Sequence, residues 1–264
     1  MEPVWSRRIA WMALLLGLMA ALVLFAPARW LASAVAGATD GRLQLLNPRG
    51  SLWAGRADLL FTGGTGSQTR AALPQGIRWQ LRPGWTDGGP AMHVTLNAPC
   101  CTPDPMRLSL RPGIGGGSVA LAASRSQWPA DLLTGLGTPW NTLRLEGRLQ
   151  LQTDGFTARW HQGRLGMDGR LDIDAFDVAS RLSTLRPLGS YRLELDAADD
   201  GNTASLALST HSGALQLSGE GQWVGSRLRF KGVAEAAKGR ETALSNLLNI
   251  IGRRDGSRSL LSLG

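Results

Sequence analysis

The sequence predicts a mainly β protein: an N-terminal transmembrane helix, then a large curved antiparallel β-sheet, shaped as a groove or a sandwich, with one or two short helices. Three observations predict this fold class. An uncharged apolar run lies near the start of the chain, and apolar and polar residues then alternate along many short segments. The 264 residues include 34 glycines but only 6% aromatic residues. Short strands joined by tight turns have this composition.

The apolar run covers residues 9–25 and has no charged side chain. At about 1.5 Å per residue, it would form a helix of about 25 Å, near the thickness of the hydrocarbon core of a bilayer. Arg7 and Arg8 precede it, whereas only Arg29 follows within the next dozen residues. The positive-inside tendency then places the N-terminus in the cytoplasm and the rest across the membrane. We expect residues 1–36 to form the N-terminus and anchor, and residues 37–264 the β-rich domain.

A cleaved secretory signal is the competing interpretation of this segment. Residues 32–34 and 34–36 have the small side chains of a cleavage site. However, the apolar core exceeds the roughly 7–15 residues of a signal peptide, and both sites lie beyond Arg29 and Trp30. These features favour a retained anchor.

Alternation between apolar and polar residues begins near Gly41 and recurs almost to the C-terminus. It is clearest over residues 142–153, where leucines face one way and mostly arginine, glutamate and glutamine the other, as in a half-buried antiparallel strand. We count roughly a dozen such strands. A flat sheet that wide is uncommon, so the sheet should curl, fold over as a groove or split into a sandwich. Gly147, Gly219 and Gly221 fall on the apolar side of their strands and predict bends or bulges.

Two segments break the alternation. Residues 128–137 predict a short helix, with a proline near its start and a glycine at its end, that would join two possible sheet halves, 37–126 and 138–264. Residues 241–251 have leucine and isoleucine at helical spacing and predict a helix packed on the apolar side of the sheet.

Composition and motifs do not indicate a catalytic, metal or cofactor site. The net charge is +8, yet no run of five or more basic residues occurs, so we expect no nucleic-acid partner. Nucleophile elbows, phosphate-binding loops and zinc spacings are missing from the sequence. Four aspartates form an acidic patch without the spacing of a calcium loop, and three histidines are isolated in the sequence. These residues are Asp168, Asp172, Asp174 and Asp177, and His93, His161 and His211.

The two cysteines, Cys100 and Cys101, are adjacent and lie between prolines. Neighbouring residues of an extended chain point to opposite sides, so a disulfide between them would need a distorted turn. The sequence allows three states of these cysteines: a vicinal disulfide, two reduced thiols or an intermolecular bridge.

Three segments together resemble the type II secretion system protein N (general secretion pathway protein N) family. The first, residues 47–57, contains Gly50-Ser51-Leu52-Trp53-Ala54-Gly55, similar to a Gly-Thr/Ser-x-Trp-x-Gly element of that family. The second is the Trp79 strand within residues 73–81, and the third is the C-terminal segment 247–256. With the anchor, the likeness covers nearly the whole chain, although the cysteine pair and the glycine-rich loop 113–117 depart from it.

The resemblance implies an accessory, non-enzymatic component of the type II secretion system of a Gram-negative bacterium. It would be a single-pass inner-membrane protein with its N-terminus in the cytoplasm and its β domain in the periplasm. Its partners would be other secretion proteins, bound through sheet edges or tryptophan-bearing strands, with Gly50, Leu52, Trp53, Gly55 and Trp79 as candidate binding residues. The alternative is a periplasmic lipid-binding or lipid-transfer module whose apolar β groove holds acyl chains.

Overall fold

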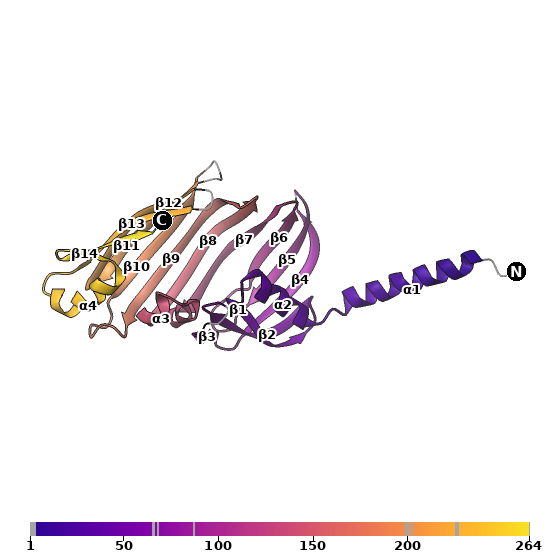
Figure 1. The fold of residues 1–264 in the computed structure, drawn as a ribbon, viewed down its shortest axis with the longest axis horizontal. Coiled ribbons are helices and arrows are strands. Elements are labelled where there is room, and N and C mark those ends of the chain that lie inside the picture. The colour runs from indigo at the N-terminus through magenta and orange to yellow at the C-terminus, as the bar shows by residue number, and fades with distance from the viewer. Residues whose placement is uncertain are drawn as a thin grey trace.

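The structure is a computed structural model that describes residues 4–64, 67, 69–86, 88–198, 201, 203–224 and 227–263. Fifteen strands form one antiparallel sheet in the order β1-β2-β4-β5-β6-β7-β8-β9-β10-β11-β12-β13-β15-β14, and β3 pairs with β2 beside this path. The sheet is open and curved (Figure 1), so the mainly β prediction is confirmed and the strands do not divide into a sandwich.

The strands are β1 (Leu43–Gly50), β2 (Ala54–Thr62), β3 (Arg70–Ala72), β4 (Ile77–Thr86), β5 (Gly89–Asn97), β6 (Met106–Gly113), β7 (Gly116–Pro129), β8 (Leu145–His161), β9 (Arg164–Ser180), β10 (Gly189–Ala197), β11 (Thr203–Gly213), β12 (Leu215–Val224), β13 (Arg227–Ala236), β14 (Arg253–Asp255) and β15 (Arg258–Leu263). The helices are α1 (Val4–Leu24), α2 (Ala28–Ala38), the 3-10 helix η1 (Ala130–Leu136), α3 (Trp140–Leu143) and α4 (Glu241–Ile251).

Directly paired residues of neighbouring strands project to the same face of a sheet, so the strand register defines two faces. One face, here the apolar face, carries the leucine side of the predicted alternation. For example, Leu151 pairs with Ile173, which pairs with Leu193, and Leu193 pairs in turn with Leu208. The opposite face, here the polar face, carries arginine, aspartate, glutamate and glutamine.

Helices cover the apolar face only toward one end of the strands, the lower end in Figure 1. α4 places Leu244, Leu247 and Leu248 on the sheet, and each is at most 2% exposed. Their spacing of three and four residues brings them to one side of the helix, and the helix predicted over 241–251 is confirmed. Near the middle of the sheet, Leu132 of η1 fills a second cluster, and Ala28 of α2 packs in a third at the N-terminal side.

The segment 128–137 differs in part from its prediction. β7 continues through Pro129, and the helix that follows is the 3-10 helix η1. The short α3 was not predicted. β7 and β8 pair directly over a long ladder, so the sheet is continuous across the two predicted halves.

The pairing of β8 with β9 is interrupted by register shifts. The bulge predicted at Gly147 is present, because the register with β9 shifts between Glu146 and Arg148. Bends or bulges were also predicted at Gly219 and Gly221, but no bulge is present there, since both residues pair in regular register with β13. A Cβ at either glycine would lie within 3.0 Å of the ring of Phe230, so these positions make room for that ring.

The chain enters the sheet through two helices separated by a break at residues 25–27. α1 points away from the sheet, whereas α2 lies against β1 and β2 (Figure 1). The sequence predicts a transmembrane anchor within residues 1–36. Across the described residues, none of the helices combines the length and apolar character that crossing a membrane requires.

Candidate interaction surfaces

The hairpin between β1 and β2 is attached to the end of α1. The indole nitrogen of Trp53 donates a hydrogen bond of 2.8 Å to the carbonyl oxygen of Val23. The backbone N–H of Leu52 donates to the carbonyl of Ala26 at 2.7 Å, and Ser51 forms a β-bridge with Pro27. We call these contacts the helix–sheet junction.

Trp79 completes this junction from β4. Its side chain is 3% exposed, and its indole nitrogen donates a hydrogen bond of 3.1 Å to the carbonyl of Leu52. A Cβ at Gly55 would lie 2.5 Å from the Trp79 ring, so only glycine lets the ring lie across β2. Gly50 has φ +95°, a conformation that glycine adopts without strain. The five residues predicted to bind a partner therefore lie together, and the contacts described here join segments of the chain itself.

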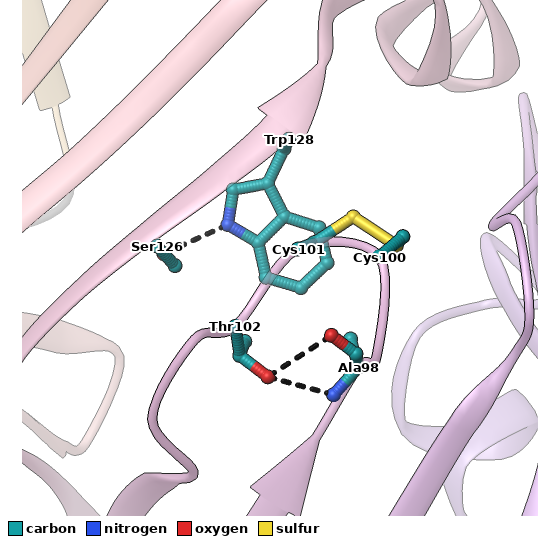
Figure 2. The surroundings of a disulfide bond; sticks show 6 residues. All are labelled: Ala98, Cys100, Cys101, Thr102, Ser126 and Trp128. Carbon is teal, nitrogen blue, oxygen red and sulfur yellow. Dashed lines mark hydrogen bonds between the residues drawn. A yellow bond between two sulfur atoms is a disulfide. The ribbon is translucent and has the colours of Figure 1, made fainter.

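Cys100 and Cys101 form a vicinal disulfide in the turn after β5 (Figure 2). Cys101 is 3% exposed and packs in the cluster that contains Leu132 and Trp128. Thr102 fixes the turn, because its hydroxyl donates to the carbonyl of Ala98 and accepts from the N–H of the same residue. This segment anchors the middle of the sheet to η1.

The apolar face is uncovered beyond the three helices. Leucine and isoleucine side chains from β6 to β11 lie there half-buried, outside the three core clusters. We call this region the open strip and define it by Leu108, Leu110, Leu121, Leu171, Ile173, Leu193, Leu195 and Leu206. Trp85 and Trp160 extend the apolar face toward the upper ends of their strands and are 75% and 44% exposed. Apolar side chains that stay partly exposed on one face of a sheet are candidates for an interaction site.

The polar face is stabilised by ion pairs across neighbouring strands. Asp174, whose side chain is 6% exposed, accepts hydrogen bonds from Arg192 Nε at 2.7 Å and Nη2 at 2.9 Å. His211 Nε2 lies 3.1 Å from the same carboxylate. The hydrogen bonds from Arg192 hold the pKa of Asp174 below its ordinary value, against the opposing effect of burial.

The acidic patch predicted from the sequence consists of ion-paired residues. Each of the four aspartates has an arginine partner in the structure: Asp168–Arg159, Asp172–Arg170, Asp174–Arg192 and Asp177–Arg148. Arginine partners neutralise the carboxylates that a cation would need. In the described part of the chain, no group of three or more histidine, cysteine, aspartate or glutamate residues could hold a metal ion.

The structure also shows one serine–histidine contact that the sequence did not suggest. His93 on β5 and Ser109 on β6 are direct cross-strand partners, and Nδ1 of the histidine lies 3.1 Å from the serine Oγ. The register of β5 and β6 places these two residues opposite each other, and both side chains face the polar side. Within the described residues, no carboxylate hydrogen-bonds the imidazole, so the third group that orients a catalytic histidine is missing.

The fold and its surfaces define the class of protein: one extended β-sheet with an apolar surface, joined to an N-terminal helix. A model of the family "Type II secretion system (T2SS), protein N" matches residues 41–260. The chain therefore belongs to the type II secretion system protein N family, as its sequence motifs suggested. The family is an accessory component of the secretion machinery. No curated protein and no solved structure matches the chain.

Proposed function

We propose that this protein is an inner-membrane accessory component of the type II secretion system, which binds another secretion protein through the open strip of its periplasmic sheet. The family match over residues 41–260 supports the secretion role. The proposed binding surface rests on one observation: the leucines of the open strip, between β6 and β11, are not covered by a helix. A protein surface packed on this strip would bury them, and apolar burial is the dominant favourable contribution to most protein association.

The sheet edges are weaker candidates for partner binding than the open strip. β1, at one edge, contains Pro48 and a register shift between Leu46 and Arg49. β14, at the other edge, has three exposed residues, each of them charged. Proline, bulges, charge and short length all oppose addition of a further strand.

The membrane attachment is assigned to α1, with the N-terminus in the cytoplasm. Residues 9–25 are uncharged, and the side chains described from Ala10 to Phe25 are exposed, for example Leu16 at 76% and Phe25 at 81%. Burial of these side chains in lipid would remove that apolar area from water. Arg7 and Arg8 on the N-terminal side support the orientation.

A lipid-binding or lipid-transfer module is the second candidate function. The open strip consists of leucine and isoleucine side chains, and acyl chains pack on such a surface as well as apolar protein side chains do. The two candidate functions therefore differ in what binds the open strip, a protein or a lipid. Identifying the molecule bound there distinguishes them.

Site-specific photo-crosslinking in living cells tests the proposal. A benzophenone amino acid replaces Leu206, which belongs to the open strip, and in a matched variant Ala207, which is exposed on the polar face of the same strand. Consecutive strand residues point to opposite faces, so the probes differ only in the face they sample. We expect Leu206 to give adducts with a secretion protein and Ala207 to give few, with the adducts identified by mass spectrometry.

Phospholipid or lipopolysaccharide adducts at Leu206 would favour the lipid module and reject the protein-docking proposal. Equal adducts at both positions would show contact without selection for the apolar face, and would reject both candidates.

A further inference from the structure

Three arginines stand side by side on the polar face of the first strands. Arg49 of β1 is the direct partner of Arg56 of β2, and Arg56 is the direct partner of Arg78 of β4. Adjacent strands are about 4.8 Å apart, so the three backbone positions span about 10 Å across the sheet. We call these three residues the arginine row.

Like charges directly opposite each other destabilise a sheet, and several arginines elsewhere on the polar face pair with acids, among them Arg148, Arg170 and Arg192. In the described part of the chain, none of the three guanidinium groups of the row has an ion-pair or hydrogen-bond partner, and all three residues are exposed. Asp58 faces the same side of β2, two residues from Arg56, but it accepts a hydrogen bond of 3.0 Å from Asn47. The positive charge of the row is therefore available to an external anion.

The row lines an open pocket of about 820 Å³ on the polar face. Gln80, Thr95 and Asn97 also line it and add neutral hydrogen-bonding groups beside the guanidiniums. Guanidinium forks match the geometry of phosphate oxygens, and neutral amides and hydroxyls match the hydroxyls of a polyol. The lining thus fits a phosphate with an attached glycerol-like group.

The position of the pocket identifies the source of the phosphate. Gly50 and Ala54 also line it and flank the turn of residues 51–53, which makes the contacts of the helix–sheet junction. The arginine row therefore lies beside the end of α1, where the sheet comes nearest to that helix (Figure 1). If α1 is in the membrane, the row faces the layer of lipid headgroups.

We propose that the arginine row and its pocket bind the phosphate headgroup of an anionic phospholipid at the membrane surface. This inference rests on the proposed attachment of α1 to the membrane. Headgroup binding would fix the sheet at a defined distance and orientation from the bilayer, because the row and the end of α1 are joined through one hairpin.

Native mass spectrometry of the full chain in nonionic detergent micelles tests this inference. The micelles are titrated with phosphatidylglycerol or with zwitterionic phosphatidylcholine, and retained lipid is counted. One variant has glutamine at all three positions of the arginine row. The control has the same loss of charge elsewhere, through glutamine at Arg227, Arg229 and Arg253, which are exposed and lie on β13 and β14.

We expect the wild type and the control to retain phosphatidylglycerol in preference to phosphatidylcholine. The row variant should bind phosphatidylglycerol about 100-fold more weakly, if each arginine contributes about fivefold near an anionic surface. Equal weakening in the control would show unspecific charge attraction, and no preference in the wild type would show no site; either result overturns the inference. Binding of a polyglutamate peptide to the row, without phosphatidylglycerol binding, would assign the row to an acidic protein instead and also overturn it.

Membrane fractionation of the same variants separates this inference from the proposed function. If the row variant stays in the membrane fraction but loses phosphatidylglycerol, the attachment through α1 stands and the headgroup site is supported. If the wild type itself is absent from the membrane fraction, the proposed attachment fails whatever the micelle titration gives.

Discussion

Replacing Leu248 by alanine tests whether α4 is an integral part of the sheet. Leu248 is fully buried between the helix and the apolar face, and its backbone carbonyl accepts a hydrogen bond from the hydroxyl of Ser259. The substitution keeps the backbone and its hydrogen bond but removes most of the side chain. Burial of a leucine contributes about 1.5–3 kcal/mol, and the cavity left behind adds a further cost. We expect the free energy of unfolding to fall by about 2–5 kcal/mol.

Ile250→Ala is the matched control, because Ile250 lies on the same helix and is 45% exposed. Alanine is also the better helix former, so this control should change the free energy of unfolding by no more than about 0.5 kcal/mol. The assay is urea unfolding of the full chain in nonionic detergent, followed by the circular dichroism of the sheet. Similar losses in the two variants would refute the packing of α4 on the apolar face.

Three further perturbations address the other parts of the molecule. Leu16→Arg should cost about 2.5–3.5 kcal/mol of insertion free energy and release the protein from the membrane fraction; a carbonate-resistant membrane fraction in this variant would rule out attachment through α1. Gly55→Ala should lower the midpoint of urea unfolding, because the added Cβ would meet the Trp79 ring at 2.5 Å, and an unchanged midpoint would contradict that contact. Asp174→Asn should destabilise the sheet by about 1–3 kcal/mol at pH 7, measured by the same unfolding, through loss of the charged partner of Arg192.

The pH dependence of Asp174 follows from the direction of its shift. Its folded pKa lies below the ordinary value of 3.8, so the ion pair contributes fully above that value and is lost as the pH falls through the folded pKa. The stability difference between the wild type and Asp174→Asn should therefore shrink as the pH falls below about 4. A difference that stays constant to pH 2 would contradict this account.

Much of the fold could be predicted because period-two alternation and helical spacing are local properties of the sequence. The helix at 241–251 is confirmed, since its leucine spacing needs no knowledge of the rest of the chain. The alternation of apolar and polar residues could not predict which side chains face the apolar side beyond a register shift. Register shifts in β8 between Gln152 and Gly155, so Leu151 and Phe156, at odd and even positions, both lie on the apolar face.

The role of a glycine within a strand was ambiguous in the sequence, because glycine can take part in a bulge or leave room for a neighbouring side chain. Gly147 takes part in a bulge, whereas Gly219 and Gly221 leave room for Phe230 across the strand pair. The candidate site was harder still to predict. Trp79 was singled out by its motif, but the arginine row arises only when β1, β2 and β4 are set in register, and that register depends on pairing between separate strands.

The order of strands from β4 to β13 is the order of the chain, since within this range each strand pairs with its neighbours in the sequence. Assembly of this part needs no distant segment to return, so the sheet can grow hairpin by hairpin as successive segments become available. Its stability is then close to a sum of neighbour-to-neighbour interfaces. Loss of pairing at the last strands would shorten the sheet without removing the template on which the remaining strands are held.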